Sequence, residues 1–165
     1  MLSLIFLLAA TVRGPADIPS LTAASDAVVH AQVVSTSAAY GEGGGQIFTT
    51  VKLQVVEAWK GQPGAALSVL VPGGAVGELA QNVQGAASFA EGEEVVVFLK
   101  RRTENVYSVY QWALGKFSVG AAAKSLPKKA LRDRTALDCA ACKPGEPDDF
   151  SLQDLRRSVL ESARK

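Results

Sequence analysis

The sequence contains one histidine and two cysteines, and this shortage argues against several common enzyme classes. Cys139, Cys142 and His30 are too few to complete the tetrahedral ligand set of a structural zinc site. No Gly-x-Ser-x-Gly motif is present to expose a nucleophilic serine. We interpret His30, which lies in a strand pattern, as a structural residue rather than a general base. The sequence therefore predicts no catalysis, no metal site and no cofactor.

An excess of charge of one sign is also missing. The chain has 17 Lys and Arg against 16 Asp and Glu, which leaves a net charge of +1. A chain so close to neutrality has no global field that would attract nucleic acid or an anionic membrane. Basic residues nevertheless gather in one stretch, at Lys124, Lys128, Lys129, Arg132 and Arg134. We expect a solvated basic face there, and the functional alternative is a contact with an acidic surface of a partner.

No apolar stretch is long enough to cross a bilayer as a helix, which takes about 20 residues. The apolar stretch at residues 2–10 instead has the length of the core of a secretory signal peptide. We therefore expect residues 1–14 to be a signal peptide and the protein to be exported to the periplasm, the cell surface or the medium. The alternative is a buried helix that opens the domain. No stable membrane span is expected after processing.

The remaining pattern is that of short strands joined by tight turns. Apolar residues alternate with polar ones in four segments, at residues 27–33, 49–55, 67–71 and 106–112, and residues 115–119 are predicted as a last short strand. Residues 95–99 are apolar on both faces, which indicates a central strand covered on two sides. The 15 glycines supply the turns. These features predict a mainly β protein, an OB-like antiparallel β-barrel formed by residues 15–165 as one domain, with a loop at residues 120–147.

Two helices complete the predicted barrel. Residues 20–25 indicate a short helical turn before the first strand. At the other end, Ser151 is a favourable N-cap and Asp154 follows three residues later, as in a capping box. We therefore predict a C-terminal helix over residues 151–164 that covers an open end or edge of the barrel. Its apolar stripe comprises Leu152, Leu155, Val159 and Ala163.

Several short motifs follow one another between residues 17 and 119. They are Ser25-Asp26-Ala27-Val28-Val29, Lys60-Gly61, Pro72-Gly73-Gly74, and the segment from Gly85 through Phe89 to Gly92-Glu93. This arrangement resembles a family of uncharacterised exported bacterial proteins, whose pattern has Pro where this chain has Ala87. The strand order is more distantly similar to the OB-like barrel of the netrin and tissue-inhibitor-of-metalloproteinase class. Those inhibitors use an N-terminal cysteine, which this chain lacks, so the likeness implies architecture only.

The irregular Gly-rich segment after the third strand is the predicted recognition element. Its candidate binding residues are Gly73, Gly74, Gly77, Gly85 and Phe89. Together with the basic stretch they suggest a non-catalytic, exported binding or accessory module that recognises a protein or a glycan at the cell envelope. A barrel that binds single-stranded nucleic acid is a further alternative, because Lys100, Arg101 and Arg102 precede stacking aromatics at Tyr107, Tyr110 and Trp112. Near-neutral charge and export argue against it.

The pair Cys139 and Cys142 gives the main alternative function, that of a thiol redox or thiol-linked protein. Lys143-Pro144-Gly145 follows directly and breaks the helix that would lower a thiol pKa, so we predict a structural loop disulfide. Thiol titration and a measured reduction potential test this. We expect an unreactive pair with a very low potential, whereas an exposed thiol with a depressed pKa would support the redox function.

Overall fold

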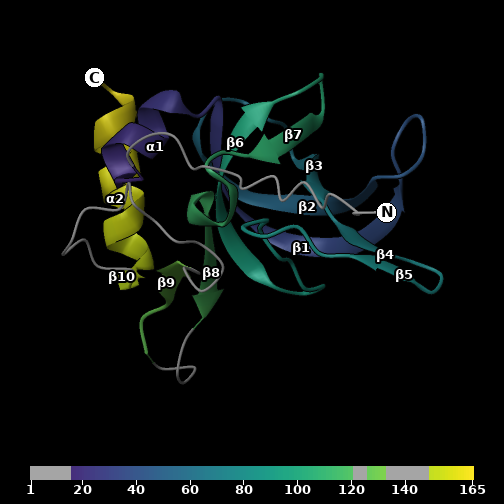
Figure 1. Cartoon of the computed structure of the whole chain (residues 1–165). Helices are drawn as coiled ribbons and strands as arrows, with labels where there is room; N and C mark the ends of the chain where they lie inside the picture. The colour runs from purple at the N-terminus through teal and green to yellow at the C-terminus, as the bar shows by residue number, and fades with distance from the viewer. Residues whose placement is uncertain (1–15, 121–125, 133–148) are drawn as a thin grey trace, which may run out of the picture.

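The computed structural model describes residues 16–120, 126–132 and 149–165 (Figure 1). The predicted signal peptide, residues 1–14, lies outside the described residues. The strands are β1 (Ala27–Tyr40), β2 (Ile47–Lys60), β3 (Ala66–Pro72), β4 (Gly74–Val76), β5 (Leu79–Gln81), β6 (Glu94–Arg101), β7 (Val106–Val109), β8 (Lys116–Gly120), β9 (Lys129–Arg132) and β10 (Asp149–Ser151). The helices are α1 (Ile18–Ala24), a 3-10 turn η1 (Trp112–Gly115) and α2 (Leu152–Ala163).

Five strands form a closed barrel, which confirms the predicted fold class. They follow the order β1-β2-β3-β7-β6, and β6 then pairs with β1 to complete the ring. All of these pairings are antiparallel except that between β3 and β7, which is parallel. Strands β8, β9 and β10 extend the sheet outward from β6, and β4 and β5 form a separate hairpin.

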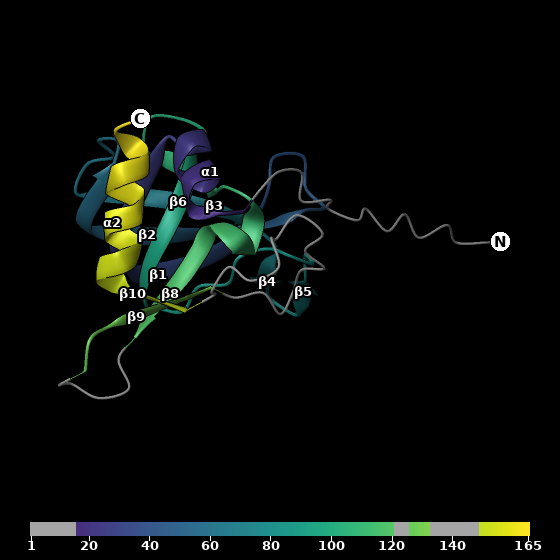
Figure 2. The same cartoon turned by 90° about the vertical axis from the view of Figure 1, so that its left-hand side faces the viewer.

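The structure has two apolar cores that share strands β1 and β6. Alternate residues of these strands, Ala27, Val29, Ala31, Val33, Val95, Val97 and Leu99, fill the interior of the barrel. The intervening residues Val28, Val96 and Phe98 lie on the outer face, where they pack with Leu21 of α1 and with Leu155 and Val159 of α2. Figure 2 shows both helices against this side of the barrel. The prediction that residues 95–99 are covered on two sides is therefore confirmed.

Each of the two α-helices begins at a capping side chain. Asp17 accepts a hydrogen bond from the backbone N–H of Ser20, at 2.9 Å, so α1 begins earlier than the predicted turn. In α2, Ser151 Oγ accepts from the N–H of Asp154 at 3.1 Å, as the sequence predicted. Leu155 and Val159 of the predicted stripe are buried, whereas Ala163 is exposed. Leu160 packs against the core in its place.

The region after β6 differs most from the sequence-based expectation. The predicted strand over residues 106–112 ends at Val109, because Gln111 and Trp112 both adopt the left-handed conformation, each with φ of 56°. The segment predicted as a loop, residues 120–147, contains the strand β9, and β8 is therefore not the last strand. Strand β9 alternates exposed and buried residues, but its buried residues are Ala130 and the cation Arg132. Because one of them is charged, the alternation of apolar and polar residues that indicates a strand is absent from the sequence.

The buried hydroxyl of Tyr107 lets the contribution of this polar group to stability be tested. Its side chain is fully buried, and its hydroxyl has no hydrogen-bond partner among the described residues. A buried hydroxyl without a partner costs free energy of folding. We therefore expect Tyr107→Phe to leave the free energy of unfolding unchanged or to raise it by up to about 1 kcal/mol, as measured by denaturant titration. Tyr107→Ala, which leaves a cavity, should instead cost about 3–5 kcal/mol. A comparable loss in Tyr107→Phe would show that the hydroxyl contributes to stability.

Candidate binding cleft

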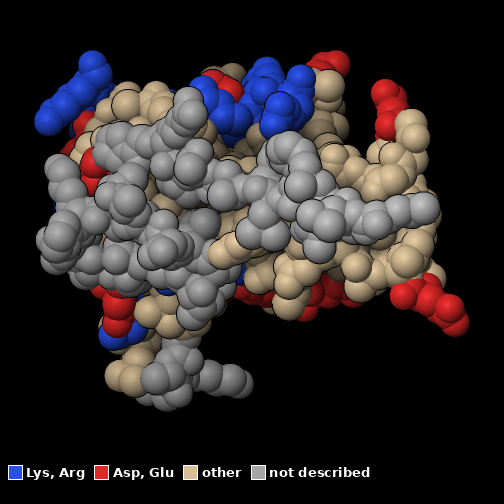
Figure 3. Space-filling model, viewed as in Figure 1, with Lys and Arg blue, Asp and Glu red and all other residues tan. Residues whose placement is uncertain are grey.

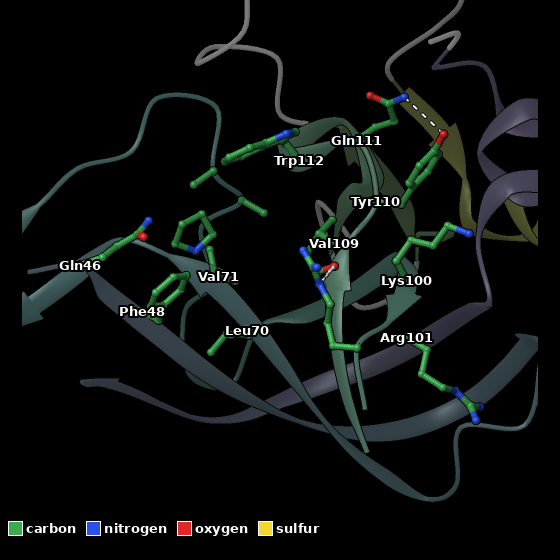
Figure 4. Close-up of a pocket in the computed structure, with 15 residues that line it drawn as sticks. Gln46, Phe48, Leu70, Val71, Lys100, Arg101, Val109, Tyr110, Gln111 and Trp112 are labelled. Carbon is green, nitrogen blue, oxygen red and sulfur yellow. Dashed lines mark hydrogen bonds between the residues drawn. The ribbon is translucent and has the colours of Figure 1, made fainter. Parts of the chain in front are cut away.

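A large recess lies where the barrel closes least completely. The ladder between β3 and β7 contains only the pairs Ser68↔Val106 and Val69↔Tyr107. Beyond them β3 continues to Pro72 along β2, while β7 follows β6 to Val109. The two strands diverge, and a cleft of about 930 Å³ opens beside them (Figure 4).

The floor and walls of the cleft are mostly apolar. Phe48 from β2 and the end of β3 form one wall, and Val109 of β7 lies on the other. Ala86 and Ala87, from the loop between β5 and β6, complete the floor. Ala86 also packs against the core of the barrel. The floor is thus continuous with a rigid apolar scaffold.

Two further aromatic rings, of Tyr110 and Trp112, line the cleft from a strained turn. Left-handed backbone at bulky residues costs about 1–2 kcal/mol each, and here Gln111 and Trp112 adopt it in succession. The surrounding contacts hold the turn in place. The N–H of Ala113 donates to the carbonyl of Gly85 at 2.9 Å, and Gly115 lets the Tyr110 carbonyl approach so closely that a Cβ atom would clash with it. Such strain is concentrated at binding and catalytic sites in proteins.

Three consecutive cations, Lys100, Arg101 and Arg102, line the cleft at the β6–β7 end. Figure 3 shows Lys and Arg side chains gathered in this part of the surface. Lys100 Nζ lies 3.3 Å from a carboxylate oxygen of Asp26. Arg101 lies over the Tyr107 ring at 5.6 Å, and Arg102 Nε donates to Ser108 Oγ at 3.1 Å. Among the described residues, neither arginine forms an ion pair with a carboxylate.

Asp26 fixes the backbone beneath these cations. Its carboxylate accepts a hydrogen bond from the N–H of Arg101 at 2.9 Å. That hydrogen bond, aided by the charges of Lys100 and Arg101, holds the pKa of Asp26 below its usual value although partial burial opposes the shift. The start of the β6–β7 turn is thereby tied to the start of β1. The backbone that carries these cations is therefore held in place, while the side chains of Arg101 and Arg102 stay exposed.

Three of the five candidate binding residues of the Gly-rich segment lie beside this cleft. Gly73, Gly74 and Phe89 line a smaller hollow of about 250 Å³. This hollow shares Val71, Pro72, Ala86 and Ala87 with the main cleft. Gly85 is buried and serves the strained turn through its carbonyl, and Gly77 lies in the turn of the β4–β5 hairpin. The sequence analysis named Gly73, Gly74 and Phe89 as candidates but did not group them with the aromatic and cationic residues of the main cleft.

The predicted basic stretch is divided among separate contacts. Lys128 pairs with Glu94 and Lys129 with Asp149, each at 2.7 Å. Arg132 is buried, donates to the carbonyl of Ala16 at 2.8 Å and lies over the Phe117 ring. Lys124, Arg134, Cys139 and Cys142 lie outside the described residues. The described part of the stretch therefore contains two exposed, paired lysines and one arginine that contributes to the fold.

The ionisable side chains near the start of β6 form two separate groups. Glu93 accepts hydrogen bonds from Lys116 and Ser118, both at 2.6 Å, and Lys116 is itself buried. On the other side, Glu94 Oε1 lies 2.6 Å from His30 Nε2 and also accepts from Lys128. Neither glutamate lines the cleft. Burial alone would raise the pKa of each, but these hydrogen bonds outweigh it and hold both pKa values below the usual range.

No protein-family model and no curated protein sequence matches this chain. In the part that the structure describes, no helix is both long and apolar enough to traverse a membrane. The same part of the chain holds no group of three or more His, Cys, Asp or Glu side chains placed to bind a metal ion. The geometry of the cleft is therefore the main basis for a functional proposal.

The lowered pKa values predict that the fold loses stability in acid. Glu57, whose pKa is lowered chiefly by a hydrogen bond from Arg156, behaves as Glu93 and Glu94 do. A carboxyl with a depressed folded-state pKa stabilises the fold above its unfolded pKa of about 4.3, and this contribution disappears as pH falls through the folded value. We expect the free energy of unfolding, measured by denaturant titration, to fall steadily as pH decreases below about 4.3.

The variant Glu93→Gln isolates one of these contributions. It should flatten the pH dependence, because the remaining amide does not titrate. At neutral pH it should also destabilise the protein, by about 3 kcal/mol, because the buried Lys116 loses its carboxylate partner. Glu78→Gln, an exposed change at the β4–β5 turn, is the matched control and should alter neither quantity. An unchanged pH slope in Glu93→Gln would contradict the assignment.

Proposed function

We propose that this protein is a non-catalytic, exported binding module that recognises a partner at the cell envelope through the cleft between β3 and β7. The observation that carries the proposal is the composition of the cleft. It combines an apolar floor, aromatic rings held on a strained turn, and two arginines without a described carboxylate partner. Such a recess is suited to a ligand that has both apolar and anionic parts.

A protein partner fits this composition better than a glycan. Interfaces between proteins are enriched in aromatic residues and arginine, and a few such residues in a desolvated pocket carry most of the binding free energy. A glycan presents many hydroxyl groups that need hydrogen-bond partners. Residues such as Leu70, Val71 and Val109 offer none through their side chains. A glycan therefore remains the second candidate ligand.

The position of the single histidine supports a non-catalytic role. His30 lies on the outer face of β1, within hydrogen-bond distance of Glu94 and 6.0 Å from the Trp59 ring. It does not line the cleft. The strongest candidate for a general base is thus held in a structural contact away from the recess. The thiol function remains the alternative hypothesis, since both of its residues lie outside the described part of the chain.

Substitution in the cleft tests the proposed function. The purified protein, Trp112→Ala, and the control Arg157→Ala on the exposed face of α2 are each immobilised, and envelope proteins and a glycan panel are passed over them. We expect the parent protein and the control to retain the same ligand. Trp112→Ala should weaken that binding by about tenfold or more, as removal of an interfacial tryptophan commonly does. Equal retention by all three proteins would show that binding occurs elsewhere.

A further inference from the structure

We propose that the ligand of the cleft is an extended, acidic segment of polypeptide, which adds as a strand to the open backbone edges of β3 and β7. This inference rests on the proposed function and specifies the chemistry of the partner. It draws on two independent features: the backbone geometry of the two strands and the cations at the rim.

The register shows which backbone groups of β3 turn toward the cleft. In an antiparallel pair, alternate residues bond to the neighbouring strand and the others face the opposite edge. The N–H of Gly73 donates to Ile47 of β2, which places Val71 and Val69 among the residues bonded to β2. Ser68 faces the other way, and its N–H donates to Asn105 at 3.0 Å. Leu70 follows Ser68 in the same orientation, so its carbonyl faces the cleft, beyond the last β3–β7 pair.

The same alternation applies to β7 on the other side. Tyr110 donates its N–H to Phe98 of β6, and Arg102 donates to Val106. The residues bonded to β6 are therefore the even-numbered ones, and Val109 turns its N–H and carbonyl away from β6. This orientation directs them to the cleft that Val109 lines. The two diverging strands thus present a donor and acceptors to a chain laid between them. Addition of an extended peptide to such an edge is a recurrent mode of recognition.

Pro72 limits where pairing is possible. It ends β3, lines the cleft and has no backbone N–H. An added strand therefore has one acceptor on β3 at Leu70 and cannot extend a regular ladder past Pro72. This arrangement disfavours indefinite edge-to-edge assembly of copies of the protein. It favours a short segment fixed at one register.

The charge of the rim selects the chemistry of that segment. Arg101 and Arg102 are exposed and form no ion pair within the described part of the chain, whereas Lys100 is shared with Asp26. Guanidinium groups bind carboxylates in a bidentate manner. An extended peptide places alternate side chains on opposite faces. Apolar side chains therefore face Phe48 and Trp112, while an acidic side chain reaches Arg102. Arg101, which lies over the Tyr107 ring and points away from Phe48 and Trp112 in Figure 4, adds positive charge at the rim.

A peptide-display selection against the immobilised protein tests the inference. We expect the enriched sequences to combine Asp or Glu with an apolar or aromatic residue in alternation. Binding of the enriched peptide should weaken by about tenfold or more in the Arg101→Gln/Arg102→Gln variant and should fall with added salt. Arg157→Gln, on α2, is the matched control and should bind as the parent does. The same peptide with N-methyl groups at alternate positions should also bind at least about fivefold more weakly, because backbone pairing is blocked.

The outcomes separate this inference from the proposed function. Enriched peptides without acidic residues, or full binding by the N-methylated peptide, would overturn the strand-addition inference, while loss of binding in Trp112→Ala would still support the cleft. A uronic-acid oligosaccharide that binds in a Trp112-dependent manner when no peptide does would likewise replace the inference and keep the function. Sedimentation of the protein as a dimer that the Arg101→Gln/Arg102→Gln variant abolishes would identify a second copy as the occupant. Ligands that bind equally to Trp112→Ala would contradict both.

Discussion

The burial of β6 on both faces is the constraint from which the rest of the structure follows. Its odd-numbered residues fill the barrel, and Val96 and Phe98 contact the helical layer outside. One edge of the strand pairs with β1, and the other pairs first with β8 and then with β7. A strand with both faces and both edges occupied has a single favourable register, because a shift of one residue would exchange the two cores. The position of the β6–β7 turn, and thus of the cations at the cleft, is fixed by this register.

Neighbouring strands of the barrel pair over very different lengths. The β1–β2 ladder extends from Val28 to Tyr40, while the β3–β7 ladder has two residue pairs. A ring of strands removes exposed edges only where neighbouring strands run together. Here the β1–β2 ladder carries register shifts, and β3 pairs with β7 no further than Val69. The cleft is the structural consequence, and it is lined by backbone that would otherwise belong to the sheet.

Local patterns predicted the strands and helices but not the cleft. The apolar run at residues 95–99 and the cap at Ser151 are both marked by residues close together in the sequence, and the sequence analysis predicted both. The sequence analysis did not predict strand β9, because its inward residue Arg132 is a cation, and its contacts with the Ala16 carbonyl and the Phe117 ring are tertiary. The cleft joins residues from β2, β3 and the segment after β6, and their meeting depends on a parallel pairing that leaves no local signal. The left-handed backbone at Gln111 and Trp112 is similarly invisible, since neither residue type favours it.

The buried pair of Lys116 and Glu93 holds the loop that lines one side of the cleft. Glu93 accepts from the N–H of Ala90 as well as from Lys116, and Lys116 Nζ lies 5.1 Å from the Phe89 ring. These contacts fix the end of the loop that supplies Ala86 and Ala87 to the floor. Apolar side chains of similar volume could fill the same space without the cost of desolvating two charges, so the advantage of the ion pair is its directionality. The loop side of the cleft is therefore held by a buried ion pair, whereas Arg101 and Arg102 of the rim are exposed. In the proposed binding mode, selectivity for a partner resides in the rim, and substitutions there leave the two cores intact.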